Sequence, residues 1–162
     1  MVNNNAIINI INKITVKNTA PCKKTLQKIV FLIQAKGVDL GCDYGIHFFG
    51  PYSADLDYAV REMNDEGILN IEYTSMEHRI SVSKENEIQE YHNTIVDTII
   101  NEFAGETPSE LELLATALYA YLNSKDVSRI KHTVIKIKGS KYSDARIDSA
   151  IERLKKLDYI VA

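Results

Sequence analysis

The segment Leu56-Asp57-Tyr58-Ala59-Val60-Arg61-Glu62-Met63 returns in outline 91 positions later as Ile147-Asp148-Ser149-Ala150-Ile151-Glu152-Arg153-Leu154. In both copies the apolar residues recur at helical spacing and are followed by a turn and a β-leaning dipeptide, Ile68-Leu69 or Tyr159-Ile160. The chain therefore carries an internal repeat of one short folding plan. The alternative is that two ordinary amphipathic helices, each followed by a strand, coincide.

A helix that leads through a turn into a strand is typical of the third helix and first wing strand of a winged helix-turn-helix. We therefore expect a mainly α-helical fold with a small β-hairpin (α+β), built from tandem winged helix-turn-helix-like units. The expected division is an N-terminal winged-helix-like unit over residues 1–84, a connecting helix over 85–104, and a C-terminal helix-turn-helix or degenerate winged-helix unit over 105–162.

The spacing of apolar residues and caps assigns elements to the first unit. The expected order is a helix from Asn3 to about Val16, a helix over Lys23–Ala35, a strand over Ile46–Phe49 ended by Gly50-Pro51, a helix over Ala54–Asn64 capped by Ser53, and a hairpin of 68–73 with 79–82. This is a complete winged helix.

The connecting helix is expected over Asn86–Phe103, with Ile88, Tyr91, Ile95 and Ile99 inside. Residues 104–107 form a linker, and Thr107-Pro108-Ser109-Glu110 has the form of a capping box at the start of the second unit. The helices expected there span 108–123, 126–137 and 144–157. Residues 159–161 then give a degenerate wing of one strand.

Composition places the chain among ordinary globular proteins, with 162 residues, 45% apolar and 25% charged. No apolar run reaches the roughly 20 residues of a membrane span, and no signal peptide is recognisable, so we expect a cytoplasmic protein without a membrane partner. The two cysteines, Cys22 and Cys42, lack a CxxC partner and are expected to be free thiols.

Charge is strongly segregated along the sequence. Residues 1–84 hold nine basic and nine acidic side chains, residues 85–124 hold eight acidic and no basic ones, and residues 125–162 hold ten basic and five acidic ones. Such asymmetry can mark a nucleic-acid-binding face. The alternative is that the cationic end folds back on the anionic segment of the same molecule.

Two motifs carry a family resemblance. The segments Lys24-Thr25-Leu26-Gln27-Lys28-Ile29-Val30 and His47-Phe48-Phe49-Gly50-Pro51-Tyr52-Ser53, with Leu56 and Glu66-Gly67-Ile68-Leu69, resemble the YwgA-like proteins of bacteria and archaea. A looser similarity links them to the Panacea antitoxin domain. The resemblance covers about residues 20–72 and implies a helix-rich, winged-helix-like fold with a regulatory or antitoxin-type role. It implies no catalytic residue.

A helix that reads DNA needs exposed basic and polar side chains, with cations near the phosphates. The first unit's third helix exposes Asp55, Asp57, Glu62 and Asp65 against Arg61 and is not expected to contact DNA. The candidate residues lie in the second unit: Lys136, Lys138, Lys141, Ser143, Arg146, Ser149, Arg153 and Lys156. The alternative is a solvated helix whose cations pair with acids such as Glu152.

No other chemistry is indicated by the sequence. The four histidines do not form a metal-binding pattern, the lysine-rich turn at 136–141 lacks P-loop spacing, and no nucleophile elbow or dinucleotide loop is present. We therefore expect neither catalysis nor a cofactor. His47 is expected to be half buried. Phe48, Phe49 and Tyr52 could form a stacking platform for bases, but packing in the core is favoured.

The leading hypothesis is a non-enzymatic regulatory protein that associates with double-stranded DNA through its basic C-terminal unit. It includes a possible homodimer, with the apolar stripe of the 86–103 helix as the dimer seam. The alternative is a protein-interaction module, antitoxin-like or adaptor, whose contact is the acidic third helix or the 85–112 surface.

Overall fold

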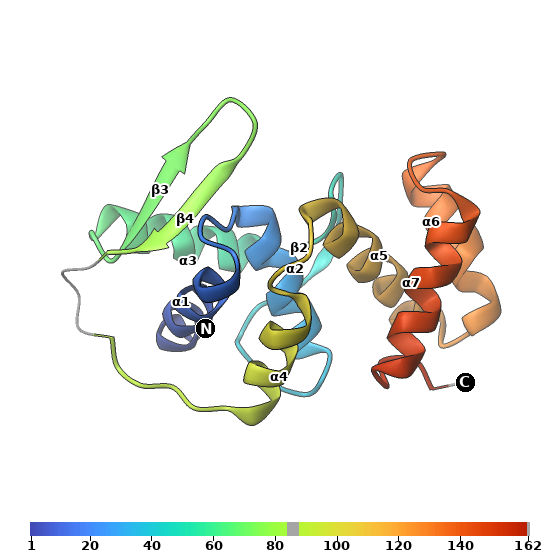
Figure 1. Ribbon diagram of the computed structural model, residues 1–162, viewed down its shortest axis with the longest axis horizontal. Coiled ribbons are helices and arrows are strands. Elements are labelled where there is room, and N and C mark those ends of the chain that lie inside the picture. The colour runs from blue at the N-terminus through green and yellow to red at the C-terminus, as the bar shows by residue number, and fades with distance from the viewer. Residues whose placement is uncertain (84–87, 162) are drawn as a thin grey trace.

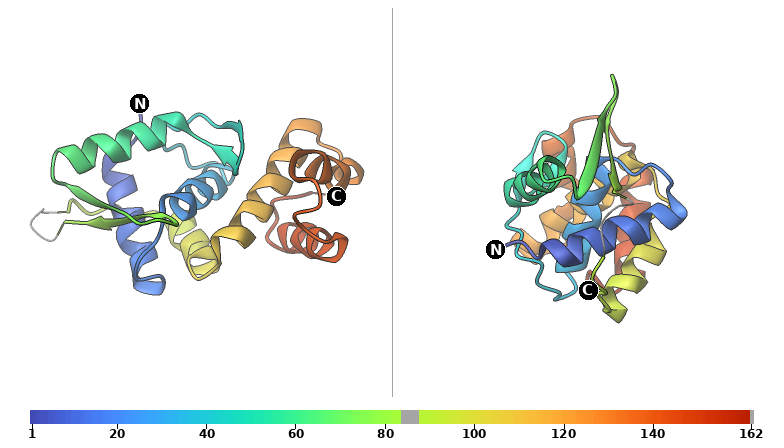
Figure 2. Two further views of the ribbon diagram at one scale, coloured as in Figure 1. Left: turned by 90° about the horizontal axis from the view of Figure 1, so that it is seen from above. Right: turned by 90° about the vertical axis from the view of Figure 1, so that its left-hand side faces the viewer.

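The structure is a computed structural model that describes residues 1–83 and 88–161. Figures 1 and 2 show an elongated molecule, with α3 and the β3–β4 hairpin near one end, α6 and α7 at the other, and α5 between them. The helices are α1 (Asn4–Lys17), α2 (Lys23–Gln34), α3 (Ala54–Asp65), α4 (Thr94–Phe103), α5 (Pro108–Ser124), the 3-10 turn η1 (Val127–Arg129), α6 (Ile130–Lys138) and α7 (Asp144–Lys156). The strands are β1 (Gly45–His47), β2 (Gly50–Tyr52), β3 (Leu69–Tyr73) and β4 (His78–Val82). The mainly α-helical class with small β-structure is confirmed.

Side-chain caps set the helix starts of the N-terminal part. The Asn3 side chain accepts a hydrogen bond from the Ala6 amide, and the Ser53 hydroxyl accepts one from the Leu56 amide. Strands β3 and β4 form the predicted antiparallel hairpin, and Leu69 lies opposite Val82 and Tyr73 opposite His78.

The first hairpin corrects one expectation. The predicted single strand over 46–49 is instead the hairpin β1–β2, in which Gly45 pairs with Tyr52 and His47 pairs with Gly50. The chain reverses at Phe48-Phe49, and Gly50, whose φ of +91° is a backbone conformation that favours glycine, begins the returning strand β2 together with Pro51. Phe48 and Phe49 consequently lie at the hairpin tip.

The connecting segment differs more strongly. Helix α4 begins at Thr94, capped by Asn93, whereas residues 88–93 are not helical, and residues 86 and 87 of the predicted helix lie outside the described residues. Side chains of α1 donate hydrogen bonds to the backbone of residues 88–93. Asn9 donates to the Gln89 carbonyl and Lys13 to the Tyr91 carbonyl. This tertiary pairing replaces the local bonds that a helix would have made there.

The proposed dimer seam is also corrected. Of the residues expected to form it, Ile99 is buried within the chain, as are its helix neighbours Val96, Ile100 and Phe103, where α4 packs on α1 and α2. Ile88 and Ile95, expected inside, are 36% and 43% exposed. The apolar face of α4 is therefore buried within one molecule.

The C-terminal part contains the predicted three helices, and Thr107 and Ser143 cap α5 and α7 through their hydroxyls. No strand follows α7 within the described residues, so the predicted wing strand over 159–161 is wrong as far as Val161. Tyr159 is instead buried, and its hydroxyl donates to the Leu32 carbonyl of α2 at 2.8 Å. That residue ties the end of the second unit to the first.

The sequence repeat has a structural counterpart in its helix and turn. The Ile68 amide donates to the Met63 carbonyl and the Tyr159 amide donates to the Leu154 carbonyl, both at 2.9 Å. The repeated aspartates also behave alike: Asp57 pairs with Lys23 at 3.0 Å, and Asp148 pairs with Lys131 at 3.2 Å, each lysine lying near the start of the preceding helix. The likeness ends where β3 begins.

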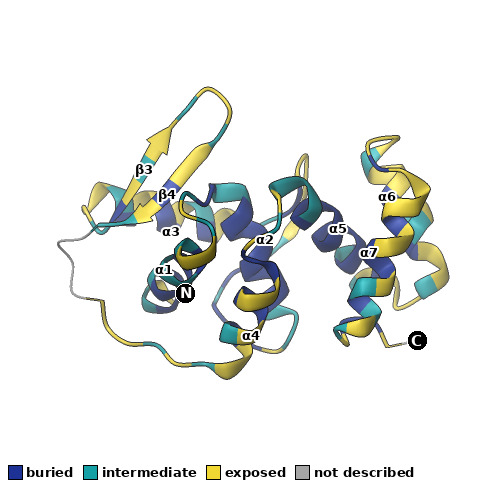
Figure 3. Cartoon of the chain, viewed as in Figure 1, coloured by how far each residue is buried: buried dark blue, intermediate teal, exposed yellow. Residues whose placement is uncertain are grey.

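Helix α5 is the centre of the molecule. It packs against α2, β2, α6 and α7, and residues 111–118 are all buried (Figure 3). The buried apolar side chains of both parts form one cluster. The 1–84, 85–104 and 105–162 boundaries stay a prediction, but the two units share a core.

We predict that Gly50→Ala destabilises the protein by more than Gly37→Ala. Both glycines have a left-handed φ, at +91° and +93°, but a Cβ at Gly50 would lie 2.8 Å from the Thr116 hydroxyl oxygen, whereas Gly37 has nothing within 4 Å. We expect Gly37→Ala to cost about 1 kcal/mol and Gly50→Ala at least about 2 kcal/mol in urea unfolding. Equal losses would contradict close packing of the hairpin on α5.

Candidate interaction site between the two hairpin tips

A buried carboxylate lies where the first hairpin, α2, α5 and α6 meet. Glu112 of α5 is fully buried and forms ion pairs with Lys138, with Lys141 at 2.8 Å, and with Lys24 at 3.9 Å. Lys138 also donates to the Phe48 carbonyl at 2.8 Å. Burial alone would raise the pKa of Glu112, but the hydrogen bonds from Lys138 and Lys141 outweigh it and hold that pKa below its ordinary value.

Lys28 of α2 lies beside this carboxylate and is only 1% exposed. Its ammonium group donates to the Pro51 carbonyl at 2.7 Å. Desolvation lowers the pKa of Lys28 to about 8, against the attraction of Glu112 and with added repulsion from Lys24 and Lys138. Lys28 thus fixes the first hairpin on α2 at an electrostatic cost.

The hairpin is held closely from the other side as well. The Gln27 side-chain amide forms two hydrogen bonds with the Ser53 backbone: it donates to the carbonyl at 2.9 Å and accepts from the amide at 2.8 Å. The Thr116 hydroxyl of α5, close to Gly50, is the one buried side-chain polar atom without a hydrogen bond among the described residues. The Gly-Pro-Tyr-Ser segment is therefore a structural joint between α2 and α5.

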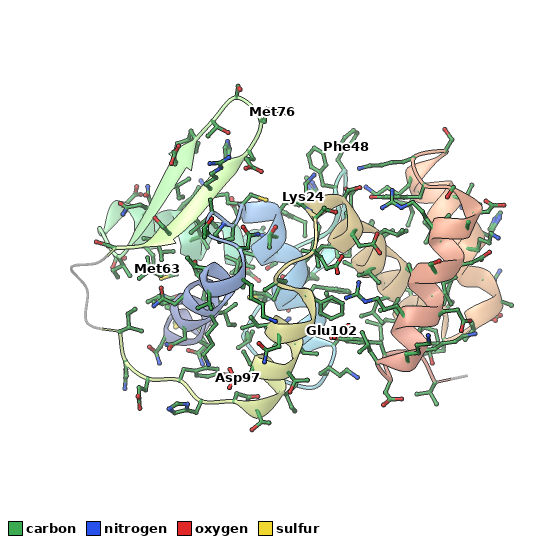
Figure 4. The ribbon with its side chains drawn as sticks, viewed as in Figure 1. Lys24, Phe48, Met63, Met76, Asp97 and Glu102 are labelled. Carbon is green, nitrogen blue, oxygen red and sulfur yellow. The ribbon has the colours of Figure 1, made fainter. Side chains whose placement is uncertain are left out.

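Exposed apolar side chains gather at the tips of both hairpins. Phe48 is 82% exposed, Phe49 49% and Met76 93%, and Figure 4 shows Lys24 between and below Phe48 and Met76. The two phenyl rings contact each other edge to face, with centroids 5.0 Å apart. Solvent-exposed clusters of this kind mark interaction surfaces.

Two adjoining clefts lie between the tips. The larger, about 400 Å³, has the turn between β3 and β4 on one side and Phe49 and Pro108 on the other. The smaller, about 320 Å³, reaches Gln27, Lys28 and Tyr52. Both share Lys23, Lys24, Phe49 and His78. We call these two clefts together the tip cleft.

The structure does not bring the eight predicted DNA contacts into one free basic surface. Four cations pair with acids of the 85–124 segment: Lys138 and Lys141 with Glu112, Arg146 with Glu110 at 3.0 Å, and Arg153 with Glu102 and Glu106, each at 3.2 Å. Ser143 caps α7. Lys136, Ser149 and Lys156 are exposed. For these four cations the structure agrees with the alternative interpretation, in which the cationic end of the chain folds back on the anionic segment of the same molecule.

Two smaller expectations change. The packing role favoured for Phe48 and Phe49 is wrong, because both rings are exposed at a hairpin tip. His47 is exposed instead of half buried, and its ring lies 4.8 Å from that of Tyr52. Cys22 and Cys42 are buried free thiols, as predicted.

No group of three or more His, Cys, Asp or Glu side chains in 1–83 and 88–161 is placed to hold a metal ion. In the same ranges no helix combines the length and the apolar character that crossing a bilayer requires.

The residues that build the tip cleft were missed by the sequence reasoning. Lys28 and Glu112 each lie within a helical run of buried apolar neighbours, Leu26 to Ile29 and Leu111 to Leu114. A charged residue on the buried side of an amphipathic helix is a signal that it has a partner elsewhere, since unpaired charges are not buried. The identity of that partner depends on tertiary contacts.

Comparisons with known proteins do not assign a family to this chain: no protein-family model matches it, and no curated protein matches it significantly. The site must therefore be interpreted from its own geometry.

We predict that Glu112→Gln lowers the free energy of unfolding by about 3–5 kcal/mol, because it leaves Lys138 as a buried charge without a counter-ion. Glu110→Gln is the matched control on the same helix, where the ion pair with Arg146 is partly exposed and its loss should cost at most about 1 kcal/mol. Urea unfolding at neutral pH measures both. Similar losses in the two variants would contradict the structural role of Glu112.

The lowered pKa of Glu112 also predicts a pH dependence. The carboxylate is ionised more readily in the folded than in the unfolded chain, so its stabilising effect is present above the ordinary value of 4.5 and is lost as pH falls through the folded-state pKa. The stability difference between wild type and Glu112→Gln should therefore be constant near pH 7 and shrink below about pH 4.5. A difference that grows on acidification would be inconsistent with this sign.

Proposed function

We propose that the protein is a protein-interaction module that binds a partner at the tip cleft. The carrying observation is that Phe49 and Met76, on two separate hairpins, line the same cleft, while Phe48, next to Phe49 at the first hairpin tip, is largely exposed. Large aromatic side chains and methionine are enriched in protein interfaces, where they provide most of the binding energy.

Rigid support for the site favours this function. The Phe48 carbonyl is fixed by Lys138, Pro51 by Lys28, and Ser53 by Gln27, so the first hairpin is preorganised on the body of the molecule. Preorganisation lowers the entropy lost on association. The second tip is also fixed at its turn, where the Thr74 hydroxyl donates to the Glu77 carbonyl and accepts from the Glu77 amide.

The same observations weigh against duplex DNA. Within the described ranges, Lys136 and Lys156 are the only cations of the eight predicted contacts without an ion pair. DNA-binding proteins that depend on phosphate contacts use about 6–10 of them. Association with DNA through the C-terminal unit therefore stays a prediction, and four of the six cations proposed for it are already paired with carboxylates. The proposed partner site is centred on the two hairpins, and it shares Asp57 with the third helix and Pro108 with the 85–112 surface, the two contacts expected from the sequence.

We predict that a protein captured from the native host by the wild-type chain is lost with Phe48→Ser/Met76→Ser and retained with Val16→Ser. Val16 is 83% exposed on α1 and does not line the tip cleft, so its substitution matches the change in surface character. The readout is quantitative affinity capture with mass spectrometry. Equal capture by the double variant would contradict the assigned surface.

A duplex-binding measurement separates the two functions. We expect binding of a random-sequence duplex to be no tighter than the about 10⁻⁴–10⁻⁶ M typical of non-specific contact, and to be unchanged by Phe48→Ser/Met76→Ser. Fluorescence anisotropy over a salt series measures it. Tight binding that falls steeply with salt and is lost in Lys136→Glu/Lys156→Glu would favour the DNA-associated function instead.

A further inference from the structure

We propose that the tip cleft recognises an acidic segment of its protein partner, with a carboxylate of that segment at Lys24 and Lys28 and a neighbouring apolar side chain between Phe49 and Met76. This inference rests on the proposed function and names the chemistry of the partner.

The first support is the local charge balance. Five lysines surround the cleft and its buried wall, whereas the carboxylates paired with them are those of Asp57 and Glu112. The lysines are Lys23, Lys24, Lys28, Lys138 and Lys141. Glu77, at the rim of the larger cleft, pairs with Arg79 at 2.9 Å and does not offset them. Positive charge is therefore in excess, and an incoming carboxylate complements it.

Lys24 is the cation best placed to receive that carboxylate. Its side chain is 31% exposed, its separation from Glu112 is 3.9 Å, and Glu112 already has two closer partners. The ammonium group lies 4.2 Å from the centroid of the Phe49 ring. A carboxylate at Lys24 would thus lie next to an exposed aromatic surface, which joins a charged and an apolar contact in one place.

Lys28 adds a second cation at the inner end of the smaller cleft. Among the carboxylates that the structure describes, none lies within ion-pairing distance of its ammonium group, which donates to the Pro51 carbonyl. Burial and the neighbouring lysines disfavour its charged form, and an anion in the cleft would favour it again. Binding is therefore expected to raise the pKa of Lys28.

The apolar part of the site is suited to a side chain. Phe49 lines both clefts and Met76 lines the larger one. Methionine is flexible and polarisable, so Met76 can adapt to different aliphatic or aromatic partners. The cleft volumes of about 400 and 320 Å³ accommodate a few side chains.

A nucleic acid fits the same site less well. Its backbone needs a continuous cationic track, but Lys23 is paired with Asp57, which leaves Lys24 and Lys28, one helical turn apart on α2, as the other lysines that line the clefts. A short acidic peptide requires only the local positive charge at Lys24 and Lys28.

The test is selection of a random dodecapeptide display library on the full-length chain, followed by fluorescence polarisation with the selected peptides. We expect them to carry Asp or Glu close to Leu, Phe or Trp, and their affinity to fall at least about tenfold with Lys24→Glu or with Phe49→Ser. Lys125→Glu is the matched control, because Lys125 is exposed at the far end of α5. Lys24→Met removes the charge without placing a second carboxylate near Glu112, should Lys24→Glu fail to fold.

Charge exchange gives a result that a merely structural role would not give. Peptides in which Arg or Lys replaces the acidic residue should lose binding to wild type and regain part of it with Lys24→Glu. Calorimetry at pH 8 in two buffers of different ionisation enthalpy should show proton uptake on binding, because the carboxylate favours the protonated form of Lys28.

Several outcomes would overturn the inference. They are selected peptides without acidic residues, binding to Lys24→Glu and Lys24→Met as tight as to wild type, and absence of proton uptake at pH 8. Displacement of the peptides by a dT20 oligonucleotide, or self-association of the chain through Phe48 and Met76 in sedimentation equilibrium, would overturn it equally. If host-partner capture still depends on Phe48 and Met76 while these results hold, the interaction function stands and only the acidic chemistry is wrong.

Discussion

The arrangement of this molecule depends on one buried carboxylate. Glu112 lies in the middle of the apolar surface of α5, where an unpaired anion would be strongly unfavourable. Lysines from α2, from the end of α6 and from the following turn supply the compensating charge. Because these lysines come from both parts of the chain, the carboxylate fixes the C-terminal helices relative to the N-terminal ones.

The same interaction shapes the proposed binding surface. Lys138 reaches past Glu112 to the Phe48 carbonyl, and Lys28 holds Pro51, so the hairpin that presents Phe48 and Phe49 is anchored from two directions. Three lysines, Lys24, Lys138 and Lys141, pair with the single buried carboxylate of Glu112. The structural requirement and the positive character of the tip cleft therefore have one origin.

Local signals predicted much of the fold. The caps at Ser53 and Thr107 were predicted correctly because a capping side chain bonds to its own helix. The repeat around Leu56 and Ile147 likewise predicted two buried helix faces and two matching turns. Long-range effects produced the errors. Residues 88–93 are not helical, and their carbonyls at Gln89 and Tyr91 accept hydrogen bonds from α1, while Tyr159 enters the core of the first unit instead of continuing a wing.

The candidate site was less accessible from the sequence than the fold. Charge counting detected that residues 85–124 and 125–162 are opposite in sign, but sequence cannot tell whether such segments face a ligand or each other. The pairs Arg146 with Glu110 and Arg153 with Glu106 answer that for these side chains. The tip cleft lies between two hairpins whose tips, at Phe48 and Met76, are 28 positions apart in the sequence. Nothing in the sequence of either turn indicates that the two tips lie close together in the fold.

The position of Glu112 has a practical consequence for dissecting the protein. A fragment that stops after α5 would retain the carboxylate without Lys138 and Lys141, and one that begins at the 104–107 linker would lose Lys24 together with the surface that accepts the Tyr159 hydroxyl. Each half would thus expose a charge and an apolar face that the other half covers. Deletion mapping would report insoluble or unfolded pieces, whereas single substitutions in the intact chain leave the shared interior in place.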